Sequence, residues 1–192
     1  MHNHPEWAAK KFSKLNGLSV KKNLKIRQDD PEYMGGKITP SEFAGKYIKS
    51  MNLKVTEKEF HAIYTSIFSL NTPLFNFLKK LRKQAKPAML SNTEKVTIEF
   101  LMKKYPALFA LFNKNLFFSC KLKSTKPGKQ IFLHALKSAK ARPEETVFID
   151  DKKENISAAK RLGMHAFRYT TLASLKNNLK KSGLKIQAVN LK

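Results

Sequence analysis

The chain has 192 residues, of which 42% are hydrophobic, and it carries a formal net charge of +24. The hydrophobic fraction excludes an intrinsically disordered protein, and the length suffices for one domain with a sizeable core or a domain with a small appendage. A single cysteine excludes an internal disulfide. No apolar run approaches the ~20 residues that a membrane-spanning helix needs. We therefore expect a soluble, cytoplasmic protein that does not contact a membrane; composition says nothing about its oligomeric state.

The positive charge comes from 33 lysines and only five arginines, against 14 acidic residues. Such a balance favours binding to nucleic-acid phosphates. Arginine, however, is the residue that reads guanine and grips phosphate with two bonds, and the lysines are spread along the chain in pairs such as Lys10-Lys11 and Lys152-Lys153. We favour a lysine-rich, solvated surface, and keep a basic nucleic-acid-binding or scaffolding protein as the alternative.

The N-terminal part of the chain is predicted to be helical. A first helix is expected over residues 5–15. Thr39 and Thr56 each stand three residues before a glutamate, in front of an apolar stripe with helical spacing, which is the signature of a capping box. No strand is predicted before about residue 85. We expect residues 1–71 to form a helical, cap-like region.

After this region the pattern changes to short apolar strands that alternate with helices. Strands separated by helices of about ten residues imply right-handed crossovers and a parallel sheet. For residues 72–192 we therefore predict an α/β fold, with a Rossmann-like parallel sheet and helices on both faces. The predicted strands are 88–90, 116–119, 146–149 and 165–169, with 186–189 as a further edge strand or a tail; the predicted helices are 73–84, 94–104, one opened by Lys126-Pro127-Gly128, 155–162 and 171–181.

Polar residues stand at the ends of three predicted strands. Ser91 and Asn92 follow the first strand, Ser119 ends the second, and Asp150 and Asp151 follow the third. Because ligands of open parallel sheets bind at the carboxyl ends of the strands, these residues are expected to share one site. Taken alone, the serine–asparagine pair and the aspartate pair each have a structural explanation as caps of the helices that follow.

Together these side chains have the chemistry of phosphoryl transfer. Two adjacent carboxylates repel each other unless a cation lies between them, and Mg²⁺ prefers such oxygen ligands. Asn155, in the first turn of the next helix, can orient an aspartate or a metal-bound water. The hydroxyl, amide and backbone N–H groups of Ser91 and Asn92 suit a phosphate oxygen, and Lys126 supplies positive charge for the same anion.

Four motifs occur in a characteristic order: LSNT at 90–93, Lys126-Pro127, VFIDD at 147–151 and AAKRLGM at 158–164. This order is similar to that of the haloacid dehalogenase-like (HAD) hydrolases, in the branch with a helical cap inserted after the first strand. The resemblance covers about residues 30–182. It implies a Mg²⁺-dependent phosphomonoesterase that acts on a small phosphorylated substrate through an aspartyl-phosphate.

The resemblance also implies a role for each motif residue. Ser91 and Asn92 would bind the transferring phosphoryl group, and Lys126 would bind it and stabilise the phosphorylated aspartate. Asp151, helped by Asp150, would hold Mg²⁺, with Asn155 in a supporting position. A dehalogenase is a rival within the family, but that branch needs no metal, so the paired aspartates disfavour it.

The first motif of the family is not recognised in the sequence. That motif is a hydrophobic strand ending in Asp-x-Asp, whose first aspartate is the nucleophile; Asp29-Asp30 instead follows NLKIRQ, which is not an apolar strand. The missing strand would be central, between the strands that end at Ser91 and Asp150. We expect a truncated or inactive hydrolase, and favour a fragment or mispredicted start. The alternatives are a degenerate member that binds without hydrolysing, and a strand supplied by another segment or chain.

Overall fold

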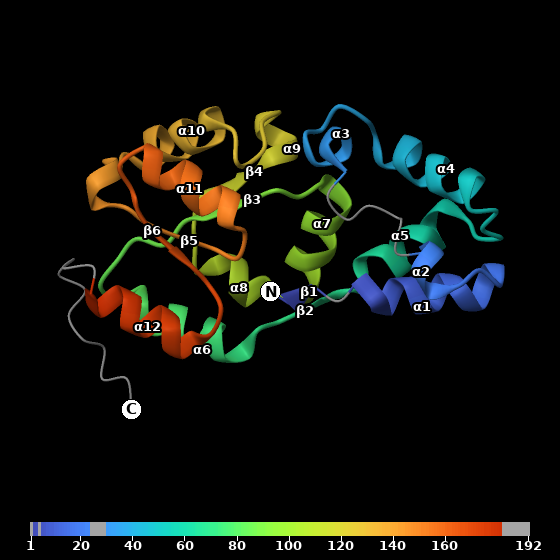
Figure 1. The fold of residues 1–192 in the computed structure, drawn as a ribbon, viewed down its shortest axis with the longest axis horizontal. Coiled ribbons are helices and arrows are strands. Elements are labelled where there is room, and N and C mark those ends of the chain that lie inside the picture. Colours follow the sequence, from blue (N-terminus) through green and yellow to red (C-terminus); the bar gives the residue numbers. More distant parts are fainter. Residues whose placement is uncertain (1, 4, 24–29, 182–192) are drawn as a thin grey trace.

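The computed structural model describes residues 2–3, 5–23 and 30–181. A helical part and an α/β part lie at opposite ends of the longest axis of the molecule (Figure 1). The predicted strand at 186–189 and Asp29 lie outside the described residues. The elements of the helical part are β1 (His2–Asn3), α1 (Pro5–Asn16), α2 (Val20–Asn23), α3 (Pro31–Met34), α4 (Pro40–Ser50), α5 (Glu57–Thr65) and β2 (Phe68–Ser69).

The three longer helices of this part, α1, α4 and α5, begin where the sequence predicts, whereas the short α2 and α3 were not predicted. The Thr39 hydroxyl accepts the N–H of Glu42, and the Glu42 carboxylate accepts the N–H of Thr39, which completes the capping box of α4. Thr56 and Glu59 form the same box at α5. The apolar stripes that follow these caps meet in one core, which contains Ala8, Phe12, Tyr33, Phe43, Ala44, Tyr47, Leu53, Phe60, Tyr64 and Ile67.

The prediction that no strand precedes about residue 85 is wrong. β1 and β2 pair antiparallel, with His2 opposite Ser69 and Asn3 opposite Phe68. Strands of two residues are too short to show an alternating pattern, so the sequence carries no local signal for them.

The α/β part confirms the predicted alternation within a few residues at each boundary. Two short helices, α8 and α9, were not predicted. The elements are α6 (Thr72–Leu81), β3 (Met89–Ser91), α7 (Lys95–Lys104), α8 (Pro106–Ala110), β4 (Leu116–Phe118), α9 (Ser119–Leu122), α10 (Lys129–Ala139), the 3₁₀ turn η1 (Pro143–Glu145), β5 (Val147–Asp150), α11 (Lys153–Arg161), β6 (His165–Arg168) and α12 (Leu172–Lys181).

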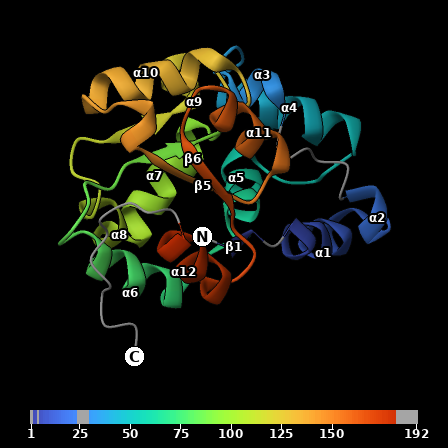
Figure 2. The ribbon, with the colours of Figure 1, turned by 60° about the vertical axis from the view of Figure 1, so that its left-hand side comes forward.

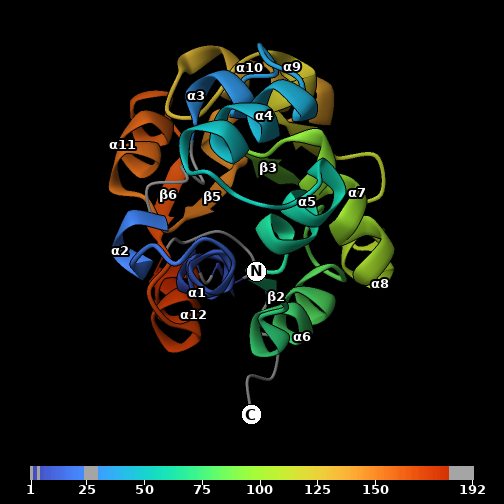
Figure 3. The same cartoon turned by 90° about the vertical axis from the view of Figure 1, so that its right-hand side faces the viewer.

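The strands of this part form two separate parallel pairs. β3 pairs with β4, with Met89 opposite Leu116, and β5 pairs with β6, with Val147 opposite His165. The parallel pairing confirms the α/β fold class. Among the described residues, no strand joins β3 to β5, and Figure 3 shows β5 and β6 on one side of the molecule with β3 on the other.

Helices cover both faces of the β5–β6 pair. On one face Phe132 of α10 and Ile156 of α11 pack with Phe148 of β5. On the other face α6 and α12 lie together (Figure 2) and pack against Val147 and Ile149. This is the doubly covered arrangement that the sequence predicts. No helix in the described part of the chain is long and apolar enough to cross a bilayer.

One buried hydroxyl ties the helical part to the α/β part. Ser119, at the start of α9, donates to the Met34 carbonyl of α3 at 2.6 Å and accepts the N–H of Thr93 at 2.9 Å. Next to this contact the backbone of Gly36 lies against the carbonyl of Cys120. The two parts therefore touch directly beside the end of β3. The division of the chain at residue 71 stays a prediction.

Candidate active site at the strand ends

A lysine joins the ends of the two parallel strand pairs. The Lys126 ammonium donates to the Leu90 carbonyl of β3 at 2.8 Å and to the Asp150 carboxylate of β5 at 2.6 Å. The side chains of Lys126 and Asp150 are only 9% and 6% exposed. The carboxyl ends of β3 and β5 thus meet at one buried ion pair, which is where a parallel sheet places its ligands.

Asp150 is surrounded by donors. Besides Lys126, its carboxylate accepts the N–H of Lys152 and the side-chain amide of Asn155, both at 2.9 Å. Burial alone would raise the pKa of Asp150, but the charge and hydrogen bond of Lys126, with these two donors, outweigh burial and hold the pKa below its usual range. Asp150 is therefore ionised at neutral pH.

Asn155 brings an unsatisfied acceptor to the same place. Its side chain is buried, its Nδ2 donates to Asp150, and its Oδ1 has no hydrogen-bond partner. Buried polar atoms are normally satisfied, so an orphan oxygen of this kind points to a water or a cation. Asp151, next to Asp150, is exposed, and its backbone carbonyl accepts the Arg168 guanidinium at 2.9 Å.

The loop after β3 holds Lys126 in place. The Asn92 amide accepts the N–H of Lys126 and donates to its carbonyl, each at 2.8 Å. The side chain of Asn92 is therefore engaged with the lysine backbone, although the sequence pattern suggested it as a phosphate ligand. Ser91, the last residue of β3, is half-buried. Within the described residues its hydroxyl has no hydrogen-bond partner, so it is available to an anion.

Sequence reasoning placed Ser119 with this group, but its hydroxyl serves another purpose. It is fully buried and links the end of β4 to Thr93 and Met34. No local pattern could have revealed this role, because the partners lie 26 and 85 residues away in the chain.

Sequence reasoning missed Glu94, which lies between the site loop and the helical part. Its carboxylate accepts the N–H and the hydroxyl of Thr97 and so caps α7, and its side chain is among the most buried in the molecule. Burial raises the pKa of Glu94, and the Thr97 hydrogen bonds offset this only in part. Burial also raises the pKa of Tyr33 and of Tyr64, and the charge of Glu94 adds to both.

Glu94→Gln is expected to stabilise the protein at alkaline pH. Because the pKa of Glu94 is higher in the folded than in the unfolded chain, the wild-type protein loses stability as pH rises through the folded value. Glutamine keeps an acceptor for Thr97 and removes the buried charge. We expect a gain on the order of 1 kcal/mol at pH 8 that vanishes near pH 4, measured by urea unfolding at both values. A loss of stability at pH 8 would contradict the assignment.

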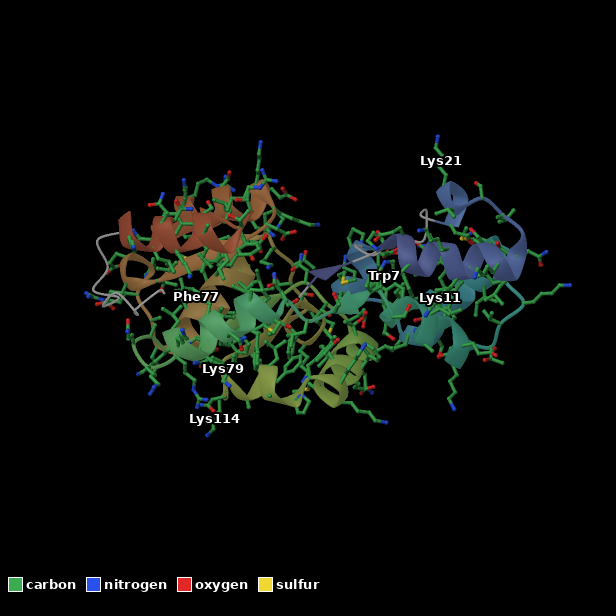
Figure 4. The ribbon with its side chains drawn as sticks, turned by 90° about the horizontal axis from the view of Figure 1, so that it is seen from below. Trp7, Lys11, Lys21, Phe77, Lys79 and Lys114 are labelled. Carbon is green, nitrogen blue, oxygen red and sulfur yellow. The ribbon has the colours of Figure 1, made fainter. Side chains whose placement is uncertain are left out.

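The positive charge of the chain does not belong to this site alone. Lys11, Lys21, Lys79 and Lys114 come from α1, α2, α6 and the turn before β4, and Figure 4 shows them at both ends of the molecule. This distribution agrees with a lysine-rich surface.

The order of the motifs and the geometry of the site agree with one family. The family model described as haloacid dehalogenase-like hydrolase matches residues 27–163. The chain belongs to the haloacid dehalogenase-like hydrolases. This HAD chain is 27% identical over 140 residues to D-ribitol-5-phosphate phosphatase of Bacteroides thetaiotaomicron, an alignment that covers 69% of the chain and 67% of that protein.

A second relative is a much longer protein. The HAD chain is also 27% identical over 140 residues to drimenol cyclase drtB of Aspergillus calidoustus. That alignment covers 70% of the chain but only 26% of the cyclase, so the chain spans about a quarter of that protein.

Solved structures agree with the assignment. A HAD-family enzyme of Bacteroides thetaiotaomicron, crystallised with magnesium and inorganic phosphate, superimposes with a TM-score of 0.77 at 26% identity, covering 88% of both chains. A predicted HAD-like hydrolase of Porphyromonas gingivalis superimposes with a TM-score of 0.78 over 94% of the HAD chain and 92% of its own, at 22% identity. The second likeness concerns the fold alone.

Proposed function

We propose that the strand-end site of this HAD chain serves the Mg²⁺-dependent hydrolysis of a small phosphate monoester. The observation that carries the proposal is the buried Lys126 ammonium, which joins the end of β3 to Asp150 of β5. A buried cation beside oxygen ligands and an available hydroxyl are groups that bind and stabilise the phosphoryl group in phosphoryl transfer. The solved relative that contains magnesium and inorganic phosphate supports the same chemistry.

The residues present fit a magnesium ion. Mg²⁺ takes oxygen ligands, commonly one or two carboxylates, and keeps several waters. Asp150, the exposed Asp151 and the unsatisfied Oδ1 of Asn155 would hold it. Among the described residues no group of three His, Cys, Asp or Glu side chains is placed to hold a metal, so water or substrate would complete the ligands. When bound, Mg²⁺ would neutralise charge on the phosphoryl oxygens.

The chain's own residues would bind and orient the phosphoryl group. The Ser91 hydroxyl would donate to one phosphoryl oxygen. The Lys126 ammonium would balance the negative charge that develops as the bond to the leaving alcohol breaks. Asn92 would act on the lysine, because its amide fixes the Lys126 backbone on both sides. Asn155 would position Asp150 in the same way.

The proposed reaction also needs an aspartate nucleophile. Its carboxylate would attack phosphorus, the alcohol would leave, and water would hydrolyse the resulting aspartyl-phosphate. Asp150 does not suit this role, because both of its oxygens accept hydrogen bonds from protein donors and its negative charge is paired with Lys126. Asp30 is paired with Lys46, and Asp151 is assigned to the metal, so no described aspartate is left for this role. We therefore propose that the 192-residue chain has little or no phosphatase activity by itself.

An assay with a generic aryl phosphate such as p-nitrophenyl phosphate tests this proposal. The 192-residue protein with Mg²⁺ is expected to release nitrophenol no faster than a buffer control. Robust Mg²⁺-dependent turnover that Asp151→Ala abolishes would contradict the proposed inactivity. That result would at the same time support Asp151 as a metal ligand.

A further inference from the structure

Helices α6 and α12 lie side by side and run in the same direction. At their starts, the side-chain amide of Asn71, just before α6, donates to the hydroxyl of Tyr169, just before α12, at 3.3 Å. Near their ends, Leu81 of α6 and Leu179 of α12 belong to one apolar cluster. The last turns of the two helices therefore lie together, at the left edge of the molecule in Figure 1.

The solvent side of these two helix ends is basic. Five of the residues 79–86 are lysine or arginine, and all five are exposed. The turn before β4 adds the exposed Lys114, because the side-chain amide of its neighbour Asn115 donates to the Pro87 carbonyl at 3.5 Å. In α12 one further lysine is exposed and one is half-buried. The cations of this α6–α12 basic face are Lys79, Lys80, Arg82, Lys83, Lys86, Lys114, Lys176 and Lys180.

No carboxylate balances the charge of this face. The sequence has no aspartate or glutamate from residue 60 to residue 93, and none after residue 154. In the described part of the chain none of the eight cations lies in an ion pair, and the two glutamates before β5 pair with Arg142. Attraction to the helix dipole accounts for Lys79 and Lys80 in the last turn of α6, but not for the three cations that follow the helix. Their mutual repulsion is relieved by an anionic partner.

The face lacks the apolar groups that a lipid surface or a single strand requires. A helix that lies in a lipid surface inserts apolar side chains, and single-strand binding proteins stack bases on aromatic rings. The Phe75 ring of α6 is half-buried, and the Lys79 ammonium lies over it, 5.7 Å from the ring centroid. Among the described residues the exposed large apolar side chains are Trp7, Leu15, Met102 and Leu133. None of these four belongs to α6 or α12, so the face matches a partner that offers negative charge alone.

We propose that the α6–α12 basic face binds the phosphate backbone of a double-stranded nucleic acid without sequence preference. Cations that neutralise phosphates release counterions, and this release supplies the affinity. Seven of the eight cations are lysines, which bind phosphates as point charges, whereas arginine is the commoner reader of bases. Because α6 leads into the start of β3, the face lies at the amino end of the sheet, away from Lys126 at the strand-end site. The binding is therefore separate from the proposed hydrolysis.

Fluorescence anisotropy with a labelled DNA duplex of about 20 base pairs tests the proposal. The 192-residue protein is expected to bind the duplex saturably at about 150 mM KCl, and to bind a second duplex of unrelated sequence equally well. A variant with Lys80→Gln, Lys83→Gln and Lys86→Gln should bind about tenfold or more weakly. The slope of log affinity against log salt should become shallower by about 2–3, because up to three phosphate contacts are lost.

A matched variant on α1 separates this face from the general charge of the chain. Lys10→Gln, Lys11→Gln and Lys14→Gln remove the same number of charges from lysines that are also exposed. Figure 4 shows Lys11 at the opposite end of the molecule from Lys79. The α1 variant is expected to lose less than about threefold in affinity, because its lysines would act only through long-range attraction. Circular dichroism and the melting temperature check that both variants are folded.

Each of three results would overturn the proposal. The duplex binds only at low salt, which would indicate plain surface charge. The two triple variants lose the same affinity, which would place the binding elsewhere. The wild-type protein binds a single strand of the same length, or vesicles of phosphatidylcholine and phosphatidylserine, more tightly than the duplex at the same salt concentration. None of these measurements uses phosphatase activity, so the proposed hydrolysis and the proposed duplex binding can fail independently.

Discussion

Lys126→Met is expected to lower the free energy of unfolding by about 3–5 kcal/mol at pH 7. The substitution removes the cation and leaves the Asp150 carboxylate, 6% exposed, without a counter-charge. It also removes the donor to the Leu90 carbonyl. Methionine keeps most of the length and volume of the lysine stem. The loss of stability therefore measures the removal of the charge rather than the creation of a cavity. Urea unfolding followed by circular dichroism measures it.

The cost of this substitution should depend on pH. In the wild-type fold Lys126 holds the pKa of Asp150 below its ordinary value, so the stability it contributes is present above about pH 4 and is lost as pH falls through the folded value. In the variant only the hydrogen bonds of Lys152 and Asn155 oppose burial, so the pKa of Asp150 is higher than in the wild type, and protonation then relieves the penalty. The difference between the two proteins should therefore shrink below about pH 4.

The Lys46–Asp30 pair is the matched control. Its charged atoms are 3.1 Å apart and Asp30 is only 5% exposed, but the Lys46 side chain is 53% exposed. Asp30 also keeps the N–H donors of Glu32 and Tyr33, so Lys46→Met should cost clearly less than Lys126→Met. Equal losses for the two methionine variants, or a loss for Lys126→Met that is independent of pH, would contradict the assignment of a buried charge pair at the strand ends.

Gly36→Ala is expected to lower the free energy of unfolding by about 3 kcal/mol, because two costs combine. The backbone of Gly36 has φ of +67°, which strains any residue with a Cβ. A Cβ at this position would also lie 2.5 Å from the backbone carbonyl oxygen of Cys120. That carbonyl belongs to α9, so relief of the clash requires the helical part to move away from the α/β part.

Two other glycines separate the strain from the clash. Gly17 has the same φ of +67°, but a Cβ there would meet nothing within 4 Å, so Gly17→Ala should cost only about 1–2 kcal/mol. Gly45 lies inside α4 in open space, so Gly45→Ala should stabilise the protein by about 0.5–1 kcal/mol. Chemical denaturation measures the free energy of unfolding of the three variants. Equal losses for Gly17→Ala and Gly36→Ala would contradict the tight contact between Gly36 and Cys120.

The sequence predicted most of the regular elements because their signals are local. The capping boxes at Thr39 and Thr56 fix helix starts within four residues of chain, and short apolar runs with polar ends mark β3 and β5. The same reasoning placed Lys126 and Asp150 at one edge of the sheet, since parallel strands share their carboxyl ends. HAD membership followed from the order of these motifs and is confirmed by the family match.

The sequence could not predict contacts that depend on distant segments. The sequence interpretation gave Asp151 the leading role, helped by Asp150, but the structure pairs Asp150 with Lys126 and leaves Asp151 exposed. It treated Asn92 as a phosphate ligand because nothing local shows that its amide spans the backbone of a residue 34 positions away. Glu94 follows the serine–asparagine motif, and nothing local in the sequence shows that its side chain is buried.

The most direct test of the proposed strand-end site is a Mg²⁺ titration of the 192-residue protein, with and without inorganic phosphate, followed by nuclear magnetic resonance. We expect saturable shifts at Asp150, Asp151 and the Asn155 side-chain amide, and at Ser91 only when phosphate is added. Asp30, an aspartate already paired with Lys46 in the helical part, should not shift. Shifts that are equal at all acidic residues, or absent at Asn155 and Asp151, would contradict the account.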